Sequence, residues 1–385
     1  MTVTAHPPIT VIVAHNRYRS ASPSGENLVV DQEIEQLVAA GLRVVPFLRH
    51  SDRIPALPLG QKLLLPLAPI RAGAAQRDLA ELIARHRPDV VHLHNPYPLL
   101  SPWVVRTAQG RGVPVVQTVH NYRHVCVSGL YFRDGMVCRD CRVDPTAAIR
   151  HACYRGSRAQ SAIMAVALQI HAGTWRGVDR FIAPTSAIQN HLRGYGISAD
   201  RIVIKPNSVA DPGDPPPEPG HGVLFAGRPS PEKGIDLLVE ACLRAGVPLR
   251  IAGGVHPTAG GLGILSPGET RAAIRQSAIV AVPSLMEDVF PTVAIEALAN
   301  GRPIIGTPFG GIPEIVGNAG WIVPPTVDAW ASALPDAICQ ANSLSGAARE
   351  RYLRLFSPAR VTDQLIGVYA GLGKRGADRE NQAHQ

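Results

Sequence analysis

A proline-rich stretch divides the chain into two parts, and this division limits every fold that the chain can adopt. Residues 211–220 read Asp-Pro-Gly-Asp-Pro-Pro-Pro-Glu-Pro-Gly. So many prolines exclude a packed helix or a central strand, because each lacks the backbone N–H and has a fixed φ angle. We interpret residues 208–221 as a linker between two domains, 1–207 and 222–356. A chain of 385 residues is long enough for each domain to bury its own core.

Both parts begin with the same alternation of short apolar strands and helices. Residues 9–14 are apolar, the next segment has apolar residues at helical spacing, and residues 43–48 form a second apolar run. Residues 223–226 open a similar series after the linker. This order is typical of doubly wound α/β domains with parallel sheets, so we predict two Rossmann-like domains.

The ends of the predicted strands carry candidate site residues, because ligands of doubly wound domains bind beyond the carboxyl ends of the strands. Gly25 lies in the loop after the first strand, where it could let the backbone approach a diphosphate; a plain turn is the alternative. His94 and His120 each follow an apolar strand. Such a histidine is either structural or catalytic, and the strand-end position favours His120 as a site residue.

Four cysteines lie between His120 and the next apolar strand, and the central pair has the Cys-x2-Cys spacing of zinc ligands. They are Cys126, Cys138, Cys141 and Cys153. We predict an insertion over about residues 122–178 in which these thiolates could hold a structural Zn²⁺ ion. Buried or redox-active thiols without a metal are the alternative, and two disulfides are not expected in a cytoplasmic chain.

The predicted insertion is also rich in arginine, within a chain whose formal net charge is +8. A basic surface followed by the apolar residues 162–170 could bind an anionic or lipid-linked acceptor, or contact a membrane. A solvated basic face beside a core helix is the alternative. No signal-like stretch opens the chain and no apolar run is long enough to span a bilayer. We therefore expect a cytoplasmic location, with peripheral contact at the inner face of the membrane left open.

Two cations stand in a turn that leads into a helix of the second part. Arg228 and Lys233 follow the strand at 223–226 and precede a helix that starts near Ile235. Two fixed cations beside the free N–H groups of a helix start would suit a diphosphate. Such a pair also occurs in ordinary surface turns, so the pair alone leaves both readings open.

The segment 283–314 reads as a strand end, a loop, a short helix, a strand and a glycine turn. Asp288 and Glu296 flank the start of the helix, and Gly310 and Gly311 form the turn. Helix N-termini favour negatively charged ligands, so we predict a nucleotide or phosphate site at this joint.

These residues resemble the signature of the retaining glycosyltransferases of family 4, which have the GT-B fold. That family has Glu-x7-Glu, then Ala-x-Ala-x-Gly-x-Pro, and later Gly-Gly-x-Pro-Glu. This chain has Asp288-x7-Glu296, with the second motif at residues 297–303 and the third at 310–314. Asp288 departs from the pattern, because the family has glutamate there; Glu287 stands immediately before it.

The resemblance implies two domains that face each other across a cleft, with a C-terminal helix crossing back to the first domain. Residues 357–385 would supply this helix and a polar tail, with Gly373 as the end of the helix. The resemblance also implies that Arg228 and Lys233 neutralise the leaving diphosphate. Glu296 would accept hydrogen bonds from ribose hydroxyls, and Asp288 would face the donor sugar.

The remaining implied site residues surround the same ligand. Gly25, Gly310 and Gly311 would line the phosphate or the sugar, and His120 would lie on the other wall. Neither acid needs to be a covalent nucleophile, and the resemblance implies no cofactor for catalysis. The four-cysteine segment also resembles some family 4-like enzymes, which leaves the structural Zn²⁺ as an expectation.

The function that follows from the resemblance is retaining transfer of a sugar from a nucleotide-diphosphate sugar to a hydroxyl acceptor. Cell-envelope polysaccharide or glycolipid synthesis is the setting that the family suggests. Other GT-B activities, namely those of a phosphorylase or an epimerase, are alternatives. Because Asp288 departs from the family pattern, an inactive sugar-binding homologue is another alternative. A zinc-containing basic protein that binds nucleic acid is a further alternative, but no aromatic-basic platform supports it, so no nucleic acid is expected as a partner.

Overall fold

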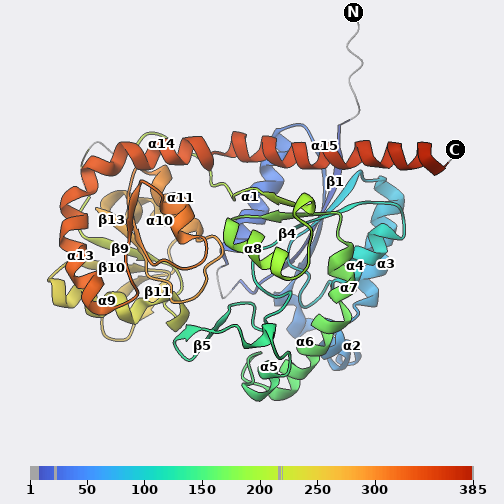
Figure 1. Cartoon of the computed structure of the whole chain (residues 1–385), viewed down its shortest axis with the longest axis horizontal. Helices are drawn as coiled ribbons and strands as arrows, with labels where there is room; N and C mark the ends of the chain where they lie inside the picture. Colours follow the sequence, from blue (N-terminus) through green and yellow to red (C-terminus); the bar gives the residue numbers. More distant parts are fainter. Residues whose placement is uncertain (1–7, 21–23, 216–217, 219, 384–385) are drawn as a thin grey trace, which may run out of the picture.

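The computed structural model describes residues 8–20, 24–215, 218 and 220–383. It contains two α/β domains that lie side by side, each built on a parallel sheet (Figure 1). The first sheet has the strand order β2-β1-β3-β4-β7-β8, and every neighbouring pair is parallel. Its strands are β1 (Thr10–Arg17), β2 (Arg43–His50), β3 (Val90–Leu93), β4 (Val115–Thr118), β7 (Arg180–Ala183) and β8 (Ile202–Ile204).

The second sheet has the order β10-β9-β13-β14-β15, again with parallel neighbours only. Its strands are β9 (Val223–Ala226), β10 (Leu249–Ala252), β13 (Ile279–Val282), β14 (Ile304–Gly306) and β15 (Gly320–Ile322). In each sheet the strand order reverses beside the first strand, which is the doubly wound arrangement. The prediction of two Rossmann-like parallel domains is confirmed, while the proposed domain limits stay a prediction.

The helices pack on the faces of these sheets because the strands are apolar on both sides, as in other parallel sheets. Val11, Ile12 and Val13, for example, are completely buried in β1. The first domain has α1 (Gly25–Ala39), α3 (Gly73–His86), α4 (Trp103–Gln109) and α8 (Ser186–Gly194). The second has α9 (Ile235–Ala245), α10 (Pro267–Gln276), α11 (Thr292–Ala299), α12 (Ile312–Val316), α13 (Val327–Gln340) and α14 (Ser345–Leu355).

Smaller elements extend from both domains. A segment between β2 and α3 contains α2 (Leu59–Leu64) and the 3₁₀ turn η2 (Leu65–Leu67), and a small hairpin in the second domain pairs β11 (Gly254–His256) with β12 (Gly260–Gly263). The segment between β4 and β7, where the cysteine insertion was predicted, also forms separate elements. They are β5 (Phe132–Arg133), β6 (Met136–Val137), the 3₁₀ turn η3 (Asp140–Arg142), α5 (Ala147–Arg150), α6 (Arg158–Ile170) and α7 (Ala172–Gly177).

The last helix, α15 (Pro358–Ala383), runs along the top of both domains and ends over the first one (Figure 1). Leu365, Tyr369 and Leu372 share a core cluster with residues of β1 and α1, which confirms the expected crossover. The prediction that Gly373 ends the helix is wrong, because α15 continues to Ala383. A glycine inside a helix costs only about 1 kcal/mol relative to alanine, and no proline follows to stop the helix. None of the described helices is both long and apolar enough to cross a membrane.

Candidate active site

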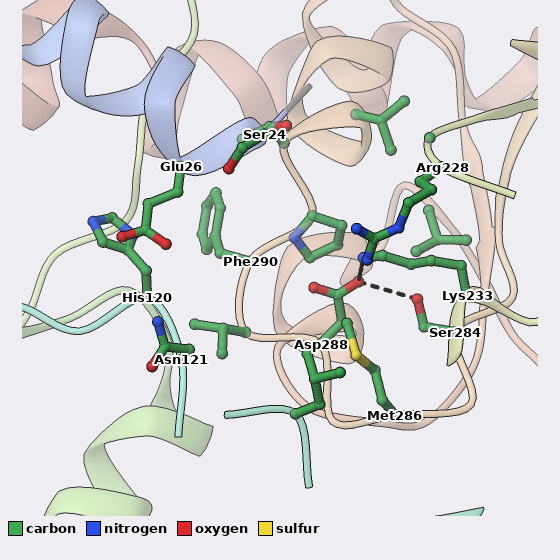
Figure 2. A pocket seen from close by; sticks show the side chains of 18 of the residues that line it. Ser24, Glu26, His120, Asn121, Arg228, Lys233, Ser284, Met286, Asp288 and Phe290 are labelled. Atoms are coloured by element: carbon green, nitrogen blue, oxygen red, sulfur yellow. Dashed lines mark hydrogen bonds and ion pairs between the residues drawn. The ribbon is translucent and has the colours of Figure 1, made fainter. Parts of the chain in front are cut away.

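A cavity of about 510 Å³ opens between the two domains at the carboxyl ends of β9 and β13. These strands are neighbours in the second sheet, and the strand order reverses between them, so this edge is the switch point of that domain. The opposite wall belongs to the first domain and contains Glu26 on α1 and His120 after β4 (Figure 2). The cavity therefore lies where doubly wound domains bind their ligands.

Lys233 and Asp288 form an ion pair on the second-domain wall. Nζ of Lys233 lies 2.5 Å from Oδ2 of Asp288, and the same oxygen accepts a hydrogen bond from Oγ of Ser284 at 3.0 Å (Figure 2). The Asp288 side chain is only 8% exposed, whereas that of Lys233 is 27% exposed. The ammonium group thus reaches the cavity with its charge balanced by a nearly buried carboxylate.

Gly234 allows Lys233 to come this close to the end of β13. Its φ angle is +70°, and a Cβ atom there would lie 1.9 Å from the carbonyl oxygen of Pro283. A side chain would therefore push the turn before α9 away from β13. The local sequence thus places the ammonium of Lys233 beside Asp288.

Arg228 provides a second cation in the same turn. Its side chain is 60% exposed and donates a hydrogen bond from Nη2 to Oε1 of Glu232 at 2.8 Å. Arg228 also lines the cavity together with Lys233. The structure therefore brings the two predicted cations to one wall, although each already has a carboxylate partner.

A second cavity, of about 530 Å³, adjoins the first, and Gly25, Gly227 and Arg228 line both. Glu296 on α11 lines the second cavity together with apolar residues such as Leu265. Burial raises the pKa of Glu296, and the nearby Arg271 opposes this rise. A carboxylate beside an apolar wall has the character of a nucleoside site, with an acceptor for hydroxyl groups next to a surface for a base.

Gly310 and Gly311 do not line either cavity, which differs from the sequence-based expectation. They lie behind Asp288: a Cβ atom on Gly310 would be 2.1 Å from the carbonyl oxygen of Asp288. The N–H of Gly311 donates a hydrogen bond to the same oxygen at 2.8 Å. The two glycines are needed for this close approach, so they position the loop that carries Asp288.

Gly25 is the first residue of α1 and lies where that helix meets the second domain. A Cβ atom there would be 3.1 Å from Oγ1 of Thr292, the first residue of α11. The N-termini of two helices from different domains therefore meet at the cavities. Both ends present unpaired N–H groups and favour an anionic ligand.

His120 is connected to a buried network in the first domain. Its Nε2 lies 2.9 Å from Nδ1 of His94, and Nε2 of His94 lies 3.2 Å from Oε1 of Glu33. Burial holds the pKa of His120 well below its usual value, and the neighbouring His94 lowers it further. His120 is therefore a neutral ring on the cavity wall, and His94 positions it instead of forming a second site.

Glu33, His92 and His94 offer ligand atoms within 4.8 Å of one another, the spacing that a metal ion would need. The ammonium of Lys205 lies 3.3 Å from Oε2 of Glu33 and is itself buried. The hydroxyl of Tyr369 on α15 lies 2.7 Å from Nδ1 of His92. A protein cation thus already balances Glu33, and the cluster ties α15 to the first domain.

Glu26 is a cavity residue that the sequence did not reveal. Its Oε2 accepts a hydrogen bond from the hydroxyl of Tyr18 at 3.1 Å, while its buried Oε1 has no partner. Burial raises the pKa of Glu26 to about 7, against the opposing effect of Arg123. The sequence signal was weak, because an acid in the first turn of a helix is also the usual partner of the helix dipole.

The segment with the four cysteines reaches the loop of Asp288. Arg139 forms an ion pair with Glu287, the residue before Asp288. Glu287 is thus held by the first domain and does not line the cavity beside Asp288. The sequence did not predict this contact, because the two residues are far apart along the chain.

The four cysteine thiols are free, and Cys141 lies close enough to the other three to interact with them electrostatically. Burial raises the pKa of Cys141 to about 11, and the thiol of Cys126 adds to this rise. Among the described residues, however, no three of these sulfurs lie within 4.8 Å of one another. The thiols therefore do not have the spacing of a tetrahedral zinc site, and no step of a reaction can be assigned to a metal there.

Family comparisons agree with this geometry. A family model described as "Glycosyl transferase 4-like domain" matches residues 6–208, and one described as "Glycosyl transferases group 1" matches residues 220–340. The chain belongs to the family 4-like, group 1 glycosyltransferases. The enzyme therefore catalyses glycosyl transfer, and its GT-B fold is the one that the sequence predicted.

Two relatives of known name are similar to this chain. The enzyme is 27% identical to a D-inositol 3-phosphate glycosyltransferase of Saccharomonospora viridis, over 90% of this chain and 88% of that protein. It is 32% identical to an MMP alpha-(1->4)-mannosyltransferase of Mycolicibacterium hassiacum, over 30% of this chain and 28% of that protein.

Two solved structures show the fold. A sucrose-phosphate synthase of Thermosynechococcus elongatus superposes with a TM-score of 0.67 at 21% identity, over 95% of this chain and 99% of that one. The HepE protein of Anabaena, solved in complex with UDP-glucose, superposes with a TM-score of 0.64 at 14% identity. That comparison covers 94% of this chain and 100% of the Anabaena chain.

Proposed function

We propose that this glycosyltransferase transfers a sugar from a nucleotide-diphosphate sugar to a hydroxyl acceptor with retention of configuration. The observation that carries the proposal is the pair of adjoining cavities, with Arg228 where they join and Lys233 beside it on the wall of the first cavity. The nucleoside fits beside Glu296 in the second cavity, and the diphosphate fits at the two cations. The sugar then lies in the first cavity between Asp288 and His120.

The reaction requires that charge on the leaving diphosphate be stabilised as the sugar–oxygen bond breaks. Lys233 is positioned for this role, since its ammonium faces the cavity from a turn that Gly234 holds against β13. The acceptor oxygen forms the new bond to the anomeric carbon on the face that the diphosphate leaves. The hydroxyl proton passes to the departing phosphate oxygen, so neither Asp288 nor Glu296 forms a covalent intermediate.

The relatives suggest the chemistry of donor and acceptor. A UDP-sugar is supported as a donor by the UDP-glucose complex of the Anabaena protein. A polyol or sugar hydroxyl is supported as an acceptor by the inositol phosphate glycosyltransferase relative. Synthesis of a cell-envelope polysaccharide or glycolipid, with an acceptor that is a sugar or is linked to a lipid, fits both.

A screen for bound donors tests the proposal. The melting temperature is measured with UDP-, GDP- and dTDP-sugars for the wild type, for Lys233→Ala, and for Lys62→Ala as a control outside the two donor cavities. We expect one class of nucleotide-sugar to raise the melting temperature of the wild type and of Lys62→Ala by the same amount, with a smaller shift for Lys233→Ala. Equal shifts in all three proteins would contradict the assignment of Lys233.

We also propose that the four cysteines can bind a structural Zn²⁺ ion, if the segment that carries them rearranges to bring the sulfurs together. Cys126, Cys138, Cys141 and Cys153 belong to one region, and their number matches a tetrahedral site. Such an ion would stabilise this segment and, through Arg139, the loop of Asp288. It would have no part in the transfer step.

A further inference from the structure

The first domain exposes a row of leucines far from the cavities described above. Leu59, Leu63, Leu64 and Leu67 on α2 and η2 are 75%, 73%, 64% and 50% exposed. Leu59, Leu63 and Leu67 recur every four residues and so lie along one side of the segment. Large apolar side chains that protrude together mark a surface that binds another protein or a membrane.

The neighbouring helix α6 extends the same surface. It contacts η2, and in Figure 1 α2 and α6 lie together at the lower edge of the first domain, on the side opposite α15. Val166 and Ile170 on α6 are 48% and 42% exposed. We call these six residues, Leu59, Leu63, Leu64, Leu67, Val166 and Ile170, the α2–α6 surface.

A cavity of about 260 Å³ lies between α2 and α6. Its lining is mostly apolar, with Leu65 from η2 and Met164 from α6 among the residues, and two cations, Lys62 and Arg155, also line it. An apolar slot with exposed cations matches an amphipathic anion that has a hydrocarbon chain, such as an anionic lipid.

The two segments that carry the α2–α6 surface contain charges of one sign only. The segments 53–77 and 145–178, which contain α2 and α6, include no aspartate or glutamate. They carry eight cations, namely Arg53, Lys62, Arg71, Arg77, Arg150, Arg155, Arg158 and Arg176, of which Arg150 pairs with Asp144 just before the second segment. Juxtaposed basic and apolar side chains bind the interface of an anionic bilayer, where the apolar groups enter the acyl region and the cations face the phosphates.

We propose that the α2–α6 surface docks the enzyme on an anionic membrane. A second copy of the chain would cover the leucines less well, because a symmetric contact would place the two basic segments opposite each other. The sequence suggested membrane contact through the arginine-rich part of the insertion and residues 162–170. The structure assigns the principal anchor to α2, a segment that the sequence analysis did not single out.

Vesicle binding tests this assignment without any donor or acceptor, so its failure would leave the proposed transfer reaction untouched. The full chain is sedimented with phosphatidylcholine vesicles that contain or lack phosphatidylglycerol, at low and high salt. The test variant is Leu59→Ser/Leu63→Ser, and the matched control is Leu243→Ser/Leu353→Ser. These control leucines are also exposed, at 76% and 46%, but belong to the second domain. All four leucines are exposed, so we expect every variant to fold, which the melting temperature checks.

The wild type and the control should bind the phosphatidylglycerol vesicles, less at high salt, and should bind pure phosphatidylcholine weakly. The Leu59→Ser/Leu63→Ser variant should lose at least roughly tenfold in affinity, because two leucines no longer enter the bilayer. Equal binding by test and control variants, or no binding by the wild type, would overturn the proposal. A dimer of the wild type that the same two substitutions abolish would assign the surface to self-association instead.

Discussion

Lys233 and Asp288 join two turns that are 55 residues apart in the sequence, with 2.5 Å between Nζ and Oδ2. Their ion pair sits at the edge of the second sheet where β9 and β13 end. A diphosphate at Lys233 would compete with Asp288 for the ammonium group. The pair therefore links donor binding to the acid that departs from the family pattern.

Substitutions at the two ends of this pair should affect diphosphate binding differently. In Asp288→Asn the amide can still accept the hydrogen bond from Ser284, but it no longer neutralises Lys233, so the affinity for a nucleoside diphosphate should hold or rise. In Lys233→Ala the affinity should fall at least roughly tenfold, because a charge-assisted contact is lost. Calorimetric titration with UDP and GDP measures both. A fall in both variants would show that Asp288 itself binds the ligand.

Lys233→Ala should also destabilise the protein. It leaves the nearly buried carboxylate of Asp288 with Ser284 as its remaining partner, and we expect a loss of about 1–3 kcal/mol in the free energy of unfolding. The double variant Lys233→Ala/Asp288→Asn removes that uncompensated charge and should recover part of the loss. Urea denaturation of the wild type, the two single variants and the double variant would show this coupling, and a purely additive cycle would argue against it.

Glu296→Gln should weaken nucleoside binding. The carboxylate lines the second cavity and can accept two hydrogen bonds from ribose hydroxyls, whereas the amide can accept fewer. We expect about a tenfold loss of affinity for the nucleoside diphosphate, with a small change in stability. Glu240→Gln, at an exposed position on α9, is the control. If both variants bind as the wild type does, the nucleoside lies elsewhere.

The buried histidines should make the fold sensitive to acid. Burial lowers the pKa of His15 and of His124 to about 3 and that of His92 to about 4. These rings stay neutral in the folded chain but take up protons in the unfolded chain below its pKa of about 6.5. Stability is therefore complete above that pH and is lost as the pH falls towards 4.

Denaturation at several pH values tests this. Between pH 7 and pH 5.5 each of the three histidines should remove on the order of 1 kcal/mol from the free energy of unfolding. His124→Gln should show a shallower pH dependence than the wild type, and the exposed His151→Gln should match the wild type. An unfolding free energy that does not change over this range would contradict the lowered pKa values.

Metal analysis decides the role of the cysteines. If the segment rearranges around Zn²⁺, protein purified without chelators should contain nearly one zinc ion per chain, and EDTA should lower the melting temperature. Cys138→Ser/Cys141→Ser should lose the metal, whereas Cys242→Ser, outside the four, should keep it. Metal-free wild-type protein with four freely titratable thiols in this segment would remove the zinc proposal.

The strands and much of the cavity could be predicted because their causes are local. The strands β1 and β9 are short runs of residues that are apolar on both faces, which is typical of a parallel sheet. Arg228 and Lys233 come directly after β9. The sequence indicates a glycine turn at Gly310 and Gly311. Glycine is required there because the backbone of Asp288 comes very close, and this approach depends on tertiary structure. Sequence patterns indicate that a glycine is needed, not which atom approaches it.

Contacts between distant residues were not predictable in this way. The pairs Arg139–Glu287 and Tyr369–His92 join segments whose local sequence gives no sign of each other. The role of Glu26 depends on its burial beside Tyr18 and Arg123, and the leucines of α2 form no sequence motif that marks a surface. Each of these features becomes visible only in the folded chain.

The most direct test of the account is turnover of a nucleotide-sugar by the wild type and by Lys233→Ala, with the donor class that the melting-temperature screen identifies. We expect the wild type to release the nucleoside diphosphate and to form a glycoside with the configuration of the donor sugar. Lys233→Ala should keep its fold and lose at least roughly tenfold in kcat/KM. Release of a sugar phosphate or an epimerised sugar by the wild type, or an unchanged kcat/KM in Lys233→Ala, would contradict the central claim.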